Sequence, residues 1–309
     1  MAPLGLSALS SMLRRRPRPE PWSTPQASWS RAFGLGWRDP YSVRYASNLD
    51  DGPWHGMPLG GFGAGCIGRS SRGDFNLWHL DGGEHWYGTI PDCQFAMWES
   101  DGADTRAHAL ATAPDRDDTR ADGEDPLSAW QWYPASTNDT TTGTYAARYP
   151  LSWTRYSGVF AAEVSCEAFS PILPGDYQRS SYPVAVFRWT LRNPSNRPLQ
   201  LSLLLSWRNT VGWFTNTDPS AEVHFRDDGS PEHNYAPAIG VGEGQCNRWV
   251  DQPGLKGVLL DGRRSQPLAE GEGQWCLALP DNLEDVEVMR CSSWDPTGDG
   301  AELWQSFAA

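Results

Sequence analysis

The stretch FAAEVSCEA, residues 160–168, decides the fold class of this chain. Apolar residues stand at every second position, and Glu163, Ser165 and Glu167 lie between them. This period of two is typical of a strand that buries one face and exposes the other. The same alternation recurs in residues 185–192 and 199–207. The connection NPSNRP, residues 193–198, predicts that these two strands form a hairpin.

Other parts of the sequence predict further short strands at residues 95–98, 257–260, 275–279 and 286–290. Residues 100–128 are rich in Asp, Thr, Ala and Arg, which is typical of a solvated loop. We find no stretch with a sustained helical period. Many short alternating strands separated by Pro and Gly predict an all-β fold, an antiparallel two-sheet β-sandwich with long loops.

The first thirty residues differ in character from the rest. A short apolar patch precedes the run RRRPRP, residues 14–19, and this order is the reverse of a secretory signal. We expect residues 1–30 to form a flexible tail and residues 31–309 to form one sandwich domain. The apolar runs are too short for a transmembrane segment.

Charge and cysteine usage limit the partners and the compartment. A net charge of −13 argues against nucleic acid or an anionic membrane surface as the main partner. The six cysteines are dispersed and contain no CxxC pair, which favours reduced, individually buried thiols. We therefore expect a cytoplasmic protein, and the sequence leaves peripheral association with a membrane open.

The stretch MPLGGFGAGCIGRSSRGDFNLWHLDGGEHW, residues 57–86, is the candidate functional segment. Its glycine density predicts a loop with an unusual backbone rather than filler. The predicted structural positions are Gly60, Gly61, Gly63, Gly65, Gly68 and Gly73. The polar and aromatic residues that we expect to reach a substrate or an interface are Arg69, Arg72, Asp74, Trp78, Glu84 and His85. An ion pair between Arg72 and Asp74 is the structural alternative.

Other motifs are weaker. Residues 63–68 read G-x-G-x-x-G, but no helix pattern follows, so a dinucleotide site is disfavoured. His79 and Asp81, with a distant His224 or His233, could supply an iron site of two histidines and one carboxylate. A hydrogen-bonded histidine at a strand end is the favoured interpretation of His79. We predict no metal site and no cofactor.

Two acidic patterns complete the search for sites. Residues 295–300, DPTGDG, partly resemble a calcium loop but lack its distal glutamate, so an acidic turn is favoured. Paired carboxylates could act on a glycosidic bond, and the spacing alone does not select a pair. The candidates for such a pair are Asp74, Asp81, Glu84 and Glu99.

Several stretches recur in one order that resembles a known family. They are MPLGGFGAGCIGR (57–69), RGDF (72–75), CQFA (93–96), YP (149–150), AFSPI (168–172), PGDY (174–177), SYPVAVF (181–187), SWRN (206–209), WDP (294–296), GDG (298–300) and LW (303–304). In this order they resemble the N-terminal part of the bile-acid β-glucosidase, or non-lysosomal glucosylceramidase, family, glycoside hydrolase family 116. The resemblance covers roughly residues 35–309. Cys66 departs from the more usual Ser or Thr, and residues 79–86 do not align.

The resemblance implies an N-terminal β-sandwich that precedes an (α/α)₆ catalytic domain in a retaining β-glucosidase. Such an enzyme acts on glucosylceramide or other β-glucosides. The family's nucleophile Glu and acid/base Asp belong to the catalytic domain, and this chain has no matching positions. We therefore predict no catalytic residue in this chain. The expected partner is a catalytic domain in the same or a separate chain.

Three hypotheses follow. The first is a sandwich domain that packs on and completes a β-glucosidase catalytic domain and is inactive by itself. The second is a non-catalytic carbohydrate-binding sandwich that uses exposed tryptophans, of which the chain has 17 in all, as a stacking platform. The third is a non-haem iron oxygenase that uses His79 and Asp81.

Overall fold

The computed structural model describes residues 29–34, 56–80, 86–114, 127–213, 224–225, 229, 231–232, 242–268, 272–291, 293–296 and 298–309. Contacts divide the described residues into two compact units. Residues 29–208 and 291–309 form what we call the sandwich unit, and residues 209–290 form the second unit. Residues 1–28 of the predicted tail lie outside the described residues, while Trp29 and Ser30 already belong to a strand. The boundaries of the predicted tail and domain stay predictions.

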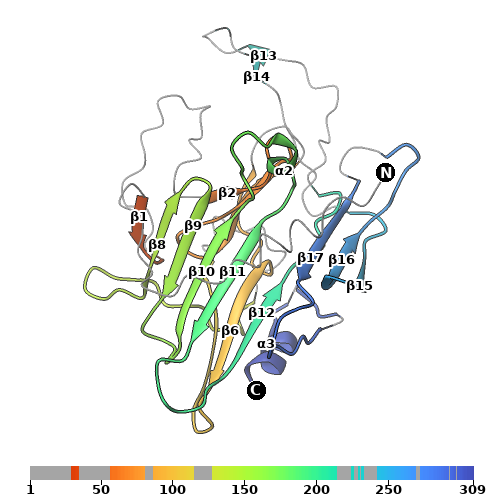
Figure 1. Cartoon of the computed structure of the whole chain (residues 1–309). Helices are drawn as coiled ribbons and strands as arrows, with labels where there is room; N and C mark the ends of the chain where they lie inside the picture. Colours follow the sequence, from red (N-terminus) through yellow and green to blue (C-terminus); the bar gives the residue numbers. More distant parts are fainter. Residues whose placement is uncertain are drawn as a thin grey trace. The chain divides into compact units, whose positions relative to one another are not determined.

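A five-stranded antiparallel sheet forms one layer of the sandwich unit (Figure 1). Val164, Cys166 and Ala168 are buried on its inner face, so the strand predicted from residues 160–168 is confirmed, although it begins three residues later. The strand order is β1 (Trp29–Ala32), β8 (Gly143–Arg148), β9 (Leu151–Tyr156), β10 (Glu163–Phe169) and β11 (Val186–Arg192).

Two smaller antiparallel sheets face this layer. The four-stranded sheet has the order β2 (Met57–Leu59), β3 (Cys66–Arg69), β4 (Phe75–His79) and β5 (Trp86–Tyr87). The three-stranded sheet has the order β12 (Gln200–Ser206), β6 (Gln94–Ser100) and β7 (Thr105–Ala109).

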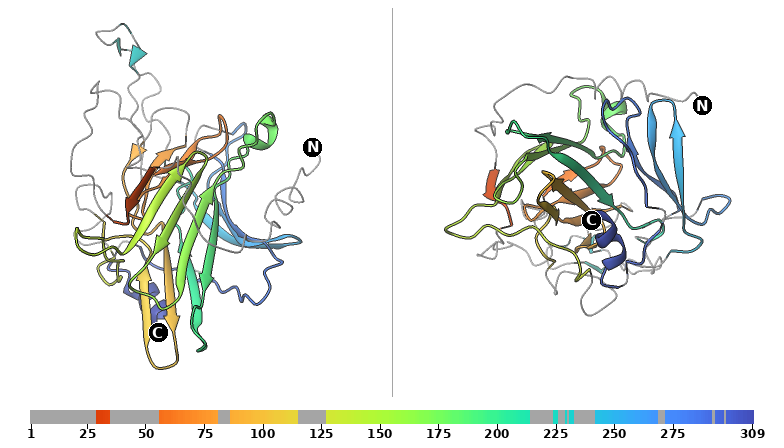
Figure 2. Two further views of the ribbon diagram at one scale, coloured as in Figure 1. Left: turned by 60° about the vertical axis from the view of Figure 1, so that its left-hand side comes forward. Right: turned by 90° about the horizontal axis from the view of Figure 1, so that it is seen from below.

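Aromatic side chains join these layers. Phe187 of β11 packs edge-on against Phe75 of β4 and Phe95 of β6, with ring centroids 5.6 and 5.2 Å apart. Seen end-on, the green strands of the five-stranded sheet and the orange strands of the four-stranded sheet lie as two layers (Figure 2). The predicted all-β, antiparallel sandwich is therefore confirmed.

The predicted hairpin between residues 185–192 and 199–207 is wrong. Both segments are strands, but β11 pairs with β10 whereas β12 pairs with β6 in another sheet. Alternation reports which side chains are buried and carries no information on the partner strand. The connection contains Pro194 and Pro198, which lack the N–H groups that would extend a ladder, and it carries the chain from one sheet to the next.

Two further elements of the sandwich unit differ from the expectation. Residues 100–128 were predicted to be a loop, but residues 105–109 form strand β7, which pairs with β6. Helix α3 (Ala301–Ala308) buries Leu303 and Trp304. The Trp304 ring stacks on Trp130, with centroids 5.2 Å apart, so the helix is held by an aromatic cluster. The other described helix is the single turn α2 (Tyr177–Ser180).

The second unit contains a three-stranded antiparallel sheet. Its order is β15 (Cys246–Gln252), β16 (Leu255–Asp261) and β17 (Gln274–Leu279), so the strands predicted at 257–260 and 275–279 are confirmed. The strand predicted at 286–290 is wrong: this segment is extended but joins no ladder. A two-stranded element pairs β13 (His224–Phe225) with β14 (Pro231–Glu232).

The six cysteines are all free, and their burial is mixed. Cys93 and Cys166 are buried and Cys66 is half-buried, as expected for reduced core thiols. Cys246, Cys276 and Cys291 are exposed, so the prediction of individual burial is wrong for these three. Neither described helix has the length and hydropathy needed to cross a membrane.

Candidate functional site: the glycine hairpin

Residues 57–69 form a hairpin that we call the glycine hairpin. Strands β2 and β3 are its arms, and residues 60–65 are its tip. At the base, the Met57 N–H donates to the Tyr145 hydroxyl at 2.9 Å. At the first tip residue, the Gly60 N–H donates to Ser170 Oγ at 2.7 Å, and that hydroxyl donates in turn to the Val184 carbonyl at 2.9 Å. The arms are thus tied to the sandwich by side chains from distant segments.

The tip itself is closely fitted on one side and open on the other. The Phe62 N–H donates to the Ser180 carbonyl of α2 at 2.9 Å. A Cβ on Gly60 would lie 1.9 Å from the Gly65 carbonyl oxygen, so only glycine fits there. Gly63 has a φ of +69° and open space around it, and the Phe62 side chain is 49% exposed. The tip therefore presents an aromatic side chain on a constrained backbone.

The other predicted glycines serve the packing of the strands. A Cβ on Gly61 would lie 2.4 Å from the carbonyl carbon of Ser181, and one on Gly65 would lie 2.4 Å from the carbonyl oxygen of His79. Gly68 is buried in β3 next to a register shift. These positions let the glycine hairpin approach neighbouring backbone closely.

The turn that follows the hairpin, residues 70–74, is buried in the sandwich. The Asp74 carboxylate is 6% exposed and accepts hydrogen bonds from the hydroxyls of Ser70 and Thr89, the latter at 2.7 Å. Gly73 has a φ of +86°, and a Cβ there would lie 2.2 Å from the Leu110 carbonyl oxygen. This turn is a structural support of the core.

Arg72 and Asp74 take different partners, so the predicted ion-pair alternative is not what this structure contains. Arg72 Nε donates to Thr112 Oγ1 at 3.1 Å, and its Nη2 donates to the Ala113 carbonyl at 3.0 Å. These bonds clamp the turn to residues 112–113. Arg72 is half-buried and is the more accessible of the two predicted side chains.

Arg69 lies in the core, with 2% of its surface exposed. Its Nη2 donates to the Leu110 carbonyl at 2.9 Å and to the Tyr156 hydroxyl at 2.6 Å. The guanidinium also lies 5.6 Å from the ring centroids of Phe95 and Trp189. Arg69 therefore joins three sheets through hydrogen bonds and cation–π contacts, which are strong where water is excluded.

The groups around Arg69 stay neutral. Burial raises the pKa of Tyr156 and of Cys166 to about 12, and the nearby Arg69 charge only partly opposes this shift. Burial likewise raises the pKa of Tyr145 to about 12. The fixed charge near the hairpin base at neutral pH is therefore the Arg69 cation, with the buried Asp74 also attracting it.

Trp78 and His79 lie at the end of strand β4. Trp78 is 1% exposed, donates from Nε1 to the Gly88 carbonyl at 2.9 Å and packs against Trp207. His79 is half-buried and pairs with Cys66 across the ladder. Asp81, Glu84 and His85 lie outside the described residues. Within the described residues, the structure thus brings Arg69, Asp74 and Trp78 into the core rather than to a surface, and their contact with a substrate stays a prediction.

The remaining candidate acid, Glu99, has a structural role. It is 2% exposed and accepts hydrogen bonds from the Ala161 and Ala162 N–H groups at 2.8 and 2.7 Å, and from Arg106 at 3.1 Å. These bonds use the carboxylate to tie β6 to the start of β10. Glu99 and Asp74 each have their own partners and are not arranged as a facing pair.

A second buried acid was missed by the sequence analysis. Asp92 pairs with Arg208 at 2.7 Å. Burial raises the pKa of Asp92, and the Arg208 guanidinium opposes this shift. The pair lies at the ends of β6 and β12, so it too has a structural role. No pattern in the sequence indicated that these two residues would meet.

Metal-ligand groups do not converge in the part of the chain that the structure describes: no three His, Cys, Asp or Glu side chains come together there. The iron hypothesis stays a prediction, because Asp81 and His233 lie outside the described residues. In the calcium-like segment, Asp299 Oδ1 accepts from the Ala301 N–H at 2.9 Å, as an acidic turn before α3 would.

The most exposed aromatic residue of the glycine hairpin, Phe62, was missed by the choice of site residues. The search favoured charged and Trp residues, whereas an aromatic residue between two glycines is the signal that would have found it. The supporting residues Ser170 and Ser180 lie more than a hundred positions away. Ser170 falls in the resembling stretch 168–172, whereas no quoted stretch includes Ser180.

Comparison with protein families identifies what this chain is similar to. The profile of the family described as "beta-glucosidase 2, glycosyl-hydrolase family 116 N-term" matches residues 56–309. The match begins at the base of the glycine hairpin and includes the second unit and all described residues of the sandwich unit except residues 29–34. It covers well over half of the chain and agrees with the resemblance noted from the motifs. The chain therefore belongs to the glycosyl hydrolase family 116 N-terminal domain family.

Proposed function

We propose that this chain is the β-sandwich part of a retaining β-glucosidase that acts on glucosylceramide or another β-glucoside. In this proposal the chain packs on a catalytic domain, which lies in the same or a separate chain, and it is inactive by itself. The tip of the glycine hairpin makes the contact. Membership of the family and the exposed Phe62 on a fixed backbone are the observations that carry the proposal.

The structure of the tip supports a docking role. Aromatic side chains that are held rigidly lose little conformational entropy when a partner covers them, and they are enriched at the centres of interfaces. The Phe62 backbone is held by its N–H bond to the Ser180 carbonyl and by the close packing of Gly61 against residues 181–182, so less freedom remains to be lost on docking. Arg69, Asp74 and Trp78 then act as positioning residues that hold the hairpin base.

The carboxylates support the absence of hydrolysis by the chain alone. A retaining mechanism needs two carboxyl groups about 5 Å apart, one of them a nucleophile and the other an acid/base. Among the described residues of the sandwich unit, the buried acids are Asp74, Asp92 and Glu99, and each has hydrogen bonds or an ion pair of its own.

The exposed-tryptophan platform of the second hypothesis finds less support in the sandwich unit. Trp78, Trp130 and Trp304 are buried in its core. Among the described residues of this unit, the exposed large apolar side chains are Phe62, Tyr149, Tyr177 and Leu203.

The test is hydrolysis of a chromogenic β-glucoside by the purified 309-residue chain, with and without a separately expressed family 116 catalytic domain. The proposal predicts no turnover by the chain alone and a rise in turnover when the chain is added to the catalytic domain. Clear turnover by the chain alone would contradict the proposal, because a carboxylate pair would then have to lie within these residues.

A further inference from the structure

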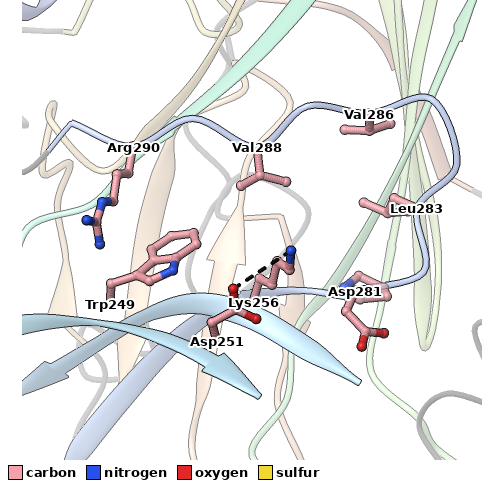
Figure 3. Close-up of a pocket in the computed structure, with 9 residues that line it drawn as sticks. Trp249, Asp251, Lys256, Asp281, Leu283, Val286, Val288 and Arg290 are labelled. Carbon is pink, nitrogen blue, oxygen red and sulfur yellow. Dashed lines mark ion pairs between the residues drawn. The ribbon is translucent and has the colours of Figure 1, made fainter. Parts of the chain in front are cut away.

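A pocket in the second unit has the chemistry of a small ligand site. It has a volume of about 280 Å³ and lies between the three-stranded sheet and the segment of residues 280–290 (Figure 3). Small-molecule pockets usually have volumes of roughly 300–1,000 Å³, so this one suits a single ring rather than a long chain. The lining residues are Trp249, Asp251, Lys256, Pro280, Asp281, Leu283, Val286, Val288 and Arg290.

The register of the sheet explains the floor of the pocket. Directly opposed residues of antiparallel neighbours share one face. Trp249 opposes Val258, and Asp251 opposes Lys256, so these four side chains stand on the same face of the sheet. The floor therefore combines one large aromatic ring with an adjacent acid and base.

The segment that fails to join the sheet forms the other wall. Figure 3 shows Val288 and Leu283 reaching from this segment toward the side chains of Trp249 and Lys256. The Arg290 guanidinium lies 5.5 Å from the Trp249 ring centroid, which fixes the indole orientation. At the far end, the Asp281 carboxylate accepts from the Gly254 N–H at 2.7 Å, which joins the segment to the β15–β16 turn.

The charges of the lining argue for a neutral ligand. Asp251 and Asp281 balance Lys256 and Arg290, so the formal charges in the pocket sum to zero. Lys256 lies 3.8 Å from Asp251 and Arg290 lies against Trp249, so neither cation is arranged as a dedicated anion site. Carboxylates accept hydrogen bonds, whereas ammonium and guanidinium groups donate them, and a ligand rich in hydroxyls can satisfy both kinds.

We propose that this pocket binds one neutral pyranose unit. In this site the C–H face of the sugar ring packs on the part of the Trp249 indole that Arg290 does not cover, because aromatic faces favour flat apolar ligand surfaces. The ring hydroxyls bond to Asp251, Lys256 and Asp281. Leu283 and Val288 cover the apolar substituent at the ring's edge. This binding site belongs to the second unit and does not depend on the proposed docking of the glycine hairpin.

The test is saturation-transfer NMR with the 309-residue chain and methyl β-D-glucopyranoside. We expect transfer to the ring C–H protons with a dissociation constant on the order of millimolar, as is typical of a ligand of this size. Trp249→Ala should weaken binding by about tenfold or more, because it removes the stacking surface. Trp275→Ala is the matched control: Trp275 stands on the same face of the same sheet, opposite Leu260, but does not line the pocket.

A second variant tests the polar lining of the pocket, and a second ligand tests its preference for a neutral sugar. Asp281→Asn keeps the shape of the side chain and should weaken binding by severalfold, with circular dichroism confirming that each variant is folded. Methyl β-D-glucuronide, which carries a carboxylate, should bind no more tightly than the neutral sugar.

Three results would overturn the proposal. The first is no saturation transfer to the wild-type chain, and the second is equal binding by folded Trp249→Ala or, if that variant does not fold, by folded Asp281→Asn. The third is tighter binding of the glucuronide.

Discussion

The base and the tip of the glycine hairpin differ although they come from one short stretch of sequence. At the base and in the turn after it, Arg69, Asp74 and Gly73 are buried, with hydrogen bonds to the core. At the tip, Gly63 faces open space and Phe62 is half exposed. The residues with the richest chemistry therefore hold the fold, and a plain aromatic residue is the one available to a partner.

Glycine also has two different roles in these two regions. Gly73 is required by close packing as well as by its positive φ, whereas Gly63 is required by its φ alone. The presence of many glycines in a stretch therefore does not by itself indicate a functional site. Substitutions at the two regions test this difference between base and tip.

The largest effect is expected at Gly73. Gly73→Ala should lower the free energy of unfolding by about 2 to 5 kcal/mol, because the left-handed backbone penalises Cβ and that Cβ would collide with the Leu110 carbonyl. Chemical denaturation measures this change. Gly63→Ala is the control and should cost only about 1 to 2 kcal/mol, from the backbone conformation alone. Equal losses in the two variants would remove the distinction between base and tip.

A smaller effect is expected at Arg69. Arg69→Met keeps much of the side-chain volume but removes the hydrogen bonds to Leu110 and Tyr156 and the cation–π contacts. We expect a loss of about 1 to 3 kcal/mol in the free energy of unfolding. Arg72→Met, at the more accessible position, should cost less than about 1 kcal/mol. A neutral Arg69→Met variant would show that the guanidinium is not a support of the base.

Alkaline pH should weaken the core around Arg69. The Cys166 thiol has a pKa of about 12 in the folded state against 9.0 as its ordinary value, so the unfolded chain loses this proton first. The stabilising contribution is fully present below pH 9 and is lost as the pH rises from 9 toward 12. The slope is up to about 1.4 kcal/mol per pH unit for one group. Cys166→Ala should reduce the slope of unfolding free energy against pH, and the exposed Cys246 provides the control substitution.

The smallest effect on stability is expected at the tip. Phe62→Ala should change the free energy of unfolding by no more than about 0.5 kcal/mol, because half of the side chain is already in water. Thermal unfolding of the variant beside Tyr149→Ala, which removes another exposed aromatic residue, checks this expectation. A large loss at Phe62 alone would assign the tip to the core.

Sequence reasoning predicted the fold class and located strands β6, β10, β11, β12, β16 and β17, because side-chain alternation directly reports burial, as in residues 163–169. Strands such as β1, β8 and β9 were missed. It did not predict which strands pair. Strands β11 and β12 are adjacent in sequence, yet their partners are β10 and β6, and this choice depends on packing between layers. The extended segment 286–290 has the composition of a strand but lies across a sheet face instead of joining it.

The role of residues 57–86 as a functional site stays a prediction. Glycine density predicted an unusual backbone there, and Gly60, Gly61, Gly65 and Gly73 leave no room for a Cβ. The family resemblance is confirmed by the match to residues 56–309. Burial of Arg69, Asp74 and Trp78 could not be read from the sequence, since their partners Leu110, Tyr156 and Thr89 are supplied by the fold. A prediction that selects charged and Trp residues near glycines therefore overestimates how many of them are exposed to a substrate.

The most direct measurement of the central claim is the affinity of the 309-residue chain for a separately expressed family 116 catalytic domain, by isothermal titration calorimetry. Phe62→Ala should bind at least about tenfold more weakly than wild type, as expected for an anchoring aromatic residue, whereas Tyr149→Ala should bind with wild-type affinity. Wild-type affinity in a folded Phe62→Ala variant would contradict the assignment of the hairpin tip to the interface.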